Sequence, residues 1–277
     1  MYSSFGIIKN PKTTHRLVGT HQKIDRIAHR ILTKNIPKKT FFPTADEIIY
    51  FEGARGPDGL KRKSPGVDEP KHFVLPENDD HHLIKMILDH QYNLRRALVK
   101  KDRVRAAFEA AWMAHAITDG LTPAHHFPLS EATKELMSNK EFVKIFGEPI
   151  KGIMRGDNIA QFARNNWLYW GAGGYMTKHC AFEYGVALAT ASIPSNRLSP
   201  QIKRKNLKKV DIETEFYRSL RQVYSLDMYK RFCKKGWTTR LAFETQKFLI
   251  PEIIKVVVLG WVAALPEQTK QKAKNEK

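Results

Sequence analysis

Apolar residues recur at helical spacing along most of this 277-residue chain, and the alternating runs typical of β-strands are few. The pattern predicts helices over residues 16–34, 79–100, 102–119, 130–139, 157–167, 175–192, 211–223 and 239–264. We therefore expect an all-α fold. With 42% hydrophobic residues, the chain can bury a sizeable core. We expect a single multi-helix domain over residues 1–265 and a flexible basic tail over 266–277, although length alone also allows two domains.

The segment over residues 111–126 places three potential metal ligands on one expected helix and on the turn that ends it. His115 and Asp119 are four residues apart and therefore share a helix face. Gly120 and Pro123 then end the helix, so His125 can fold back toward the same point. This spacing is typical of a metal site.

A second pair with the same spacing, His179 and Glu183, lies in the helix expected over 175–192. Imidazole and carboxylate ligands without cysteine suit catalytic rather than structural zinc. Either pair alone is often no more than a helix cap and a solvated surface acid. Two pairs on separate helices favour a metal centre.

Three more candidates lie upstream. His21 shares a helix face with Ile24 and Ala28, so it should point inward with them. Asp58 and His72 fall in a stretch from about residue 51 to residue 78 that is rich in glycine and proline and reads as loop. Loops on a rigid scaffold often carry chemistry.

Taken in chain order, these residues resemble the zinc-dependent phospholipase C family and its relatives, the S1/P1 nucleases. The similar pattern is a His, an Asp, a His-Phe pair, a His-xxx-Asp followed six residues on by a His, and a His-xxx-Glu. It runs from His21 to Glu183, about two thirds of the chain, and its most specific part is 115–125. The resemblance implies an all-α fold of that type and a zinc-dependent phosphodiester hydrolase.

The resemblance also implies a site for two to three zinc ions. Seven side chains would hold two of them: Asp58, His72, His115 and Asp119 the first, and His125, His179 and Glu183 the second. His21 would hold a third ion, which shares the Asp119 carboxylate. In the family an N-terminal tryptophan also binds this third ion, whereas this chain has no tryptophan before Trp112. His15, in a basic N-terminal arm, is an alternative ligand there.

The resemblance makes Asp58 the carboxylate that orients the attacking water or takes its proton. No separate nucleophile is needed, and the sequence offers no Gly-x-Ser-x-Gly, His-Glu-x-x-His or Walker motif. Two neighbours compete for assigned roles. His126 is the alternative to His125, although the spacing from Asp119 favours His125, and Asp68 is the alternative to Asp58.

The net charge points to a phosphate-ester substrate, because 47 basic and 28 acidic residues leave +19. Such a field concentrates anionic substrates, whether phospholipid headgroups or nucleic acid, and anionic membrane surfaces. A phospholipase C-like enzyme is the favoured function, with a single-strand nuclease of the S1/P1 type and a non-catalytic metal- or anion-binding module as alternatives. Residues 167–170, Trp-Leu-Tyr-Trp, would give a phospholipase an apolar surface near its site or would stack bases in a nuclease. Alternatively, they belong to the core.

The chain shows no signal peptide, which gives a cytoplasmic location by default, although the family is mostly exported. Residues 248–265 are the most apolar stretch, but their uninterrupted part is only about ten residues, short of the ~20 that span a membrane. A buried core helix is expected there, with attachment to a membrane surface as the alternative. The two cysteines make no disulfide framework, and Cys180 is expected to face the core.

Overall fold

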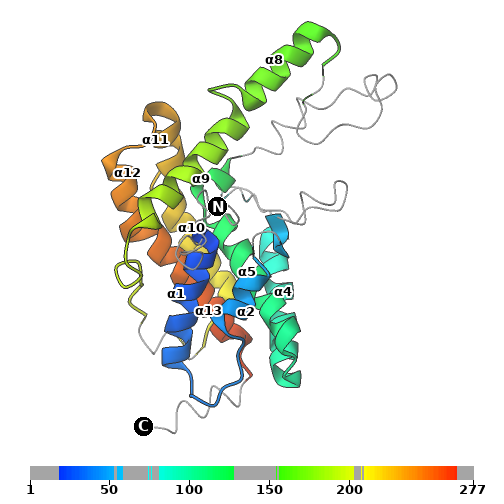
Figure 1. The fold of residues 1–277 in the computed structure, drawn as a ribbon, viewed down its shortest axis with the longest axis vertical. Coiled ribbons are helices and arrows are strands. Elements are labelled where there is room, and N and C mark those ends of the chain that lie inside the picture. Colours follow the sequence, from blue (N-terminus) through cyan, green and yellow to red (C-terminus); the bar gives the residue numbers. More distant parts are fainter. Residues whose placement is uncertain are drawn as a thin grey trace, which may run out of the picture.

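The computed structural model describes residues 19–52, 55–58, 74, 76, 81–127, 154, 156–202, 207 and 209–266. This part of the chain contains helices and no strand, which confirms the predicted all-α class (Figure 1). The described helices are α1 (Thr20–Asn35), α2 (Ala45–Tyr50), α4 (His82–Lys100), α5 (Arg103–Gly120), η2 (Pro123–His126), α8 (Ile159–Trp170), α9 (Tyr175–Ala191), α10 (Ile212–Tyr224), α11 (Met228–Lys235), α12 (Thr239–Glu244), η4 (Thr245–Leu249) and α13 (Ile250–Ala264).

The centre of the bundle is α13, in which 12 of 15 residues are buried. α1, α4, α5 and α10 pack around it. The Trp261 indole Nε1 donates a hydrogen bond to the Ala110 carbonyl at 3.0 Å, which ties α13 to α5. A helix that is apolar on all sides must be covered on all sides, so the expectation of a buried core helix is confirmed. Among the described helices, none is long and apolar enough to cross a membrane.

The helix predicted over 239–264 is divided in the structure into α12, the π-helical turn η4 and α13. Pro251 explains the division. Its nitrogen has no hydrogen to donate, and its ring would collide with the carbonyl four residues earlier in a regular α-helix. A wider π-turn just before the proline accommodates it while the chain continues in the same direction.

The long helices lie close to their predicted ranges. Three short elements were not predicted from the sequence: α2, η2 and α11. α2 begins with reciprocal hydrogen bonds between Thr44 and Glu47, a capping box that fixes its first turn. The helix predicted over 130–139 and nearly all of the predicted tail lie outside the described residues.

The helices that carry the candidate ligands pack against one another at one level of the bundle. α5 is paired along its length with α4 and also contacts α1, α2 and η2, while α9 contacts α1 and η2. Lys101, in the left-handed conformation at φ 55°, makes the tight turn from α4 into α5. α8 extends beyond the other helices at the top of the view in Figure 1.

Candidate metal centre

Three histidines from three elements converge on Asp119, which lies in the last turn of α5. His21, in the first turn of α1, places Nε2 3.2 Å from Asp119 Oδ1. His115, one turn earlier in α5, places Nε2 3.1 Å from Oδ2 of the same carboxylate. His125, in η2, places Nε2 4.0 Å from Oδ1. All four side chains are buried.

The turn after Asp119 folds back, as the sequence predicted. The Thr122 hydroxyl donates to the Thr118 carbonyl at 2.7 Å, and the His125 amide donates to the Thr122 carbonyl at 2.8 Å. Gly120 is needed because a Cβ there would overlap side chains of α4 and α10. The two threonines and the glycine thus bring His125 back beside Asp119.

The structure separates the two neighbouring candidates in η2. His125 faces the ligand groups, with Nε2 2.9 Å from Glu183 Oε1. His126 instead places Nε2 2.9 Å from the Gly120 carbonyl oxygen, which braces the turn. Burial lowers the pKa of each histidine to about 4. Both imidazoles are therefore neutral at pH 7, and neutral imidazole is the form that binds metal.

The second predicted pair lies on α9 and joins His125. His179 Nε2 is 3.2 Å from Glu183 Oε1, and the rings of His125 and His179 have centroids 4.8 Å apart. Burial alone would raise the pKa of Glu183, but neighbouring positive charges and hydrogen bonds from the two histidines hold it well below its usual range. Glu183 is therefore an anion with two imidazoles beside it.

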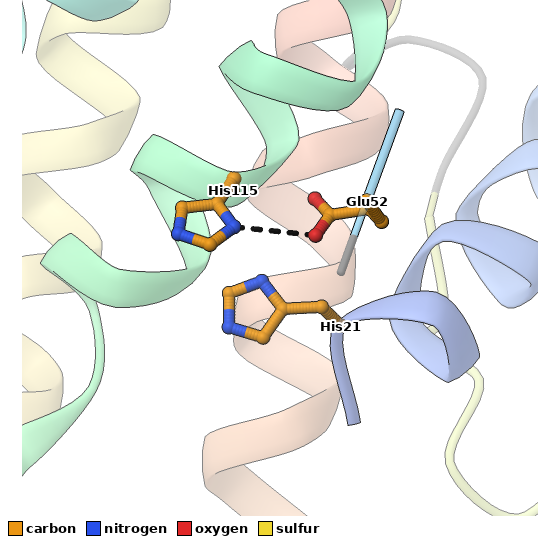
Figure 2. A group of neighbouring side chains, drawn as sticks. All are labelled: His21, Glu52 and His115. Atoms are coloured by element: carbon orange, nitrogen blue, oxygen red, sulfur yellow. Dashed lines mark hydrogen bonds and ion pairs between the residues drawn. The ribbon is translucent and has the colours of Figure 1, made fainter. Parts of the chain in front are cut away.

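Two further acids approach His115, one at each ring nitrogen. Asp58, whose side chain is 30% exposed, places Oδ1 3.7 Å from His115 Nε2. Glu52, just after α2, is buried and places Oε2 3.2 Å from His115 Nδ1 (Figure 2). Glu52 was not predicted as a site residue, because Glu52 has no helical spacing from any other ligand. Its one signal is that it follows the apolar residues Ile48 and Phe51, which places it near the core.

The electrostatics of the centre are dominated by buried carboxylates. Burial alone would lower the pKa of His115, but Asp119, Glu52 and Asp58 hold it well above its usual value. For the Asp119 carboxyl, burial acts to raise the pKa, yet nearby positive charges, His115 among them, hold it well below its usual range. Burial and the Glu52 charge raise the pKa of Asp25. Asp119 is thus a buried anion paired with histidine, and a bound cation would stabilise the same charge.

Within the described part of the chain, three groups of side chains could hold a metal ion, because the ligand atoms within each lie within 4.8 Å of one another. The groups are Asp58, His115 and Asp119; His125, His179 and Glu183; and His21, Glu52 and His115. The donors are nitrogen and oxygen, which suits zinc and other first-row divalent ions. Among the described residues, the buried His21 Nδ1 has no hydrogen-bond partner. An unpartnered ring nitrogen of this kind is expected beside an ion site.

Seven of the eight ligands predicted from the sequence are described, and each belongs to one of these groups. His72, Asp68 and His15 lie outside the described residues. In the predicted aromatic patch, Trp167, Leu168 and Trp170 are exposed and Tyr169 is buried. The prediction that Cys180 faces the core is wrong, because on α9 it lies about 100° from His179 and is exposed.

Comparisons of the chain with protein-family models, with curated proteins and with solved structures found no match.

Proposed function

We propose that the protein is a zinc-dependent hydrolase of phosphoric esters, of the phospholipase C type. One observation carries the proposal: the Asp119 carboxylate lies among three buried histidines that come from α1, α5 and η2. A carboxylate with imidazoles on several sides is what a bridging ligand between two ions requires.

The residues divide into two sets of ligands with no member in common, and a third ion would share the Asp119 carboxylate with the first. Asp58, His115 and Asp119 would hold one ion, and His125, His179 and Glu183 the other. His21, 3.2 Å from Asp119, would hold a third. When bound, such ions lower the pKa of water to near neutrality and neutralise charge on the phosphate in the transition state.

Asp58 is the residue that we assign to proton transfer. Its side chain is partly exposed, whereas His115 and Asp119 are almost wholly buried. An incoming water can therefore reach its carboxylate, which accepts a proton or orients the water by a hydrogen bond.

Charge and exposed rings support a phospholipid as the substrate. The net charge of +19 attracts anionic headgroups and surfaces. Trp167, Leu168 and Trp170 are exposed on α8, which packs against the helix that carries His179 and Glu183. Tryptophan favours the boundary between lipid and water. The same rings could stack unpaired bases, so a single-strand nuclease is the second candidate.

The test is to strip the purified protein of metal, restore zinc and measure the hydrolysis of phosphatidylcholine and of single-stranded DNA side by side. We expect two to three zinc ions per chain by elemental analysis and zinc-dependent release of phosphocholine. Cleavage of DNA alone would identify the nuclease, and zinc binding without hydrolysis of either would identify a binding module. A protein that takes up no transition metal would contradict the proposal as a whole.

A further inference from the structure

Glu52 is a buried carboxylate beside the candidate centre that the ligand pattern of the sequence does not include. Its side chain is 0% exposed, and its Oε2 atom lies 3.2 Å from Nδ1 of His115. The opposite ring nitrogen of His115, Nε2, lies between Asp119 at 3.1 Å and Asp58 at 3.7 Å. The two nitrogens of one ring therefore face different carboxylates.

The two faces of the His115 ring imply different roles. Nε2 faces two carboxylates, Asp119 and Asp58, and Nδ1 faces Glu52, so we take Nε2 as the nitrogen that offers its lone pair to an ion. When an ion replaces the proton on Nε2, the ring keeps its hydrogen on Nδ1 and donates it to Glu52. A carboxylate behind a metal-binding histidine fixes both the tautomer and the direction of the ring.

His21 also lies near Glu52, but without the hydrogen bond that His115 makes. The rings of His21 and His115 are close, with centroids 4.4 Å apart. Nε2 of His21 also faces Asp119, and a ring nitrogen of His21 lies within 4.8 Å of a ligand atom of Glu52. Figure 2 shows the Glu52 carboxylate beside the His115 ring, with the His21 ring below. One acid thus lies close to the two histidines nearest the shared carboxylate.

The fold holds Glu52 in this position. Ile48 of α2 is fully buried, and the Glu52 amide donates to the Ile49 carbonyl at 3.0 Å. Phe51 packs edge-on against Phe108 with ring centroids 5.7 Å apart. Phe108 lies two turns before His115 on α5, so this aromatic contact aligns the end of α2 with the ring that Glu52 meets.

We propose that Glu52 is a positioning residue, which accepts the Nδ1 hydrogen of His115 and so turns Nε2 of His115, and with it His21, toward Asp119. This inference depends on the proposed function, because it assigns Glu52 a role behind the ligands of that centre. It makes Glu52 neither a ligand nor a group that meets the substrate.

The test compares zinc affinity and zinc stoichiometry in the wild type and in three variants of the full chain. Glu52→Ala should weaken zinc binding about 10- to 100-fold without lowering the number of ions bound. Glu52→Gln should restore most of the affinity, because its amide oxygen can still accept the Nδ1 hydrogen. Asp46→Ala, on the short helix α2 that precedes Glu52 and with an 85% exposed side chain, is the matched control and should bind zinc as the wild type does.

A spectroscopic measurement tests the inference on the wild-type protein, without any substitution. Long-range ¹⁵N–¹H spectra of the zinc-loaded wild type should show His115 protonated at Nδ1 and coordinated through Nε2. The opposite assignment, or unchanged affinity in Glu52→Ala in a protein that binds zinc, would overturn the inference alone. The loss of one ion in Glu52→Gln would also overturn it, because it would make Glu52 a ligand. A wild type that binds no zinc would contradict both the inference and the proposed function.

Discussion

Asp119 is the residue on which most of the candidate centre depends, because its two oxygens face His21, His115 and His125. We predict that Asp119→Asn lowers activity by about 100-fold or more, since even residues behind the ligands cost 10- to 100-fold in known metal sites. Elemental analysis should show the loss of more than one ion, because an amide bridges two cations poorly. Asp46→Asn, which removes an exposed acid, is the control. The assignment of the shared ligand is wrong if His21→Ala abolishes activity while Asp119→Asn retains it.

The adjacent histidines of η2, His125 and His126, should respond differently to substitution, because their environments differ. His125→Ala should remove one ion, since His125 belongs to the group with His179 and Glu183. His126→Ala should leave the ions in place and lower the free energy of unfolding by about 1–3 kcal/mol, since it leaves the buried Gly120 carbonyl without its partner. Elemental analysis and urea denaturation of both variants separate the two roles. Equal loss of metal from both variants would mean that each substitution disrupts the whole turn, and would contradict the separate role of His125 as a ligand.

At the scale of elements, α9 must approach the segment between α11 and α12 closely, because Gly185 lies against the Trp237 indole. Trp237 stacks on Phe182 and donates a hydrogen bond from Nε1 to the Ala181 carbonyl at 3.2 Å. A Cβ on Gly185 would overlap the indole, so Gly185→Ala should cost at least about 1–3 kcal/mol of unfolding free energy. Urea denaturation measures this cost.

The matched control for that prediction is Gly173→Ala, at a position where a Cβ would have nothing within 4 Å. It should change the unfolding free energy little. Because Gly185 lies two residues after Glu183, we also expect Gly185→Ala to weaken zinc binding. A variant as stable as the wild type would mean that Trp237 can move aside at little cost.

The sequence predicted the long elements well and the short ones poorly, for a physical reason. α5 and α9 span several turns, so their apolar spacing repeats often enough to be recognised. α2 has six residues and α11 has eight, too few turns for a period to appear. At the site, the four-residue spacing finds ligands on one helix, but it says nothing about which helices meet. Glu52 reaches His115 only through the packing of α2 on α5, which no local pattern encodes.

At the scale of the whole molecule, the excess of positive charge makes association with substrate depend on salt. We predict that kcat/KM on anionic vesicles falls about tenfold or more between about 20 mM and about 500 mM NaCl, because ions screen the attraction over a distance that shortens as salt rises. Hydrolysis of zwitterionic phosphatidylcholine vesicles should change much less and serves as the control. Equal salt dependence on both surfaces would show that the net charge does not guide binding.

The position of α13 in the chain has a consequence for biosynthesis. α13 is the centre of the bundle, and α1, which carries His21, packs directly on it. Yet α13 follows every candidate ligand, from His21 to Glu183, in the order in which a ribosome makes the chain. The early helices therefore leave the ribosome before the surface that they bury against has been made, and we expect the ligands to be held together only after α13 has emerged. Metal acquisition by this protein should accordingly follow the synthesis of α13.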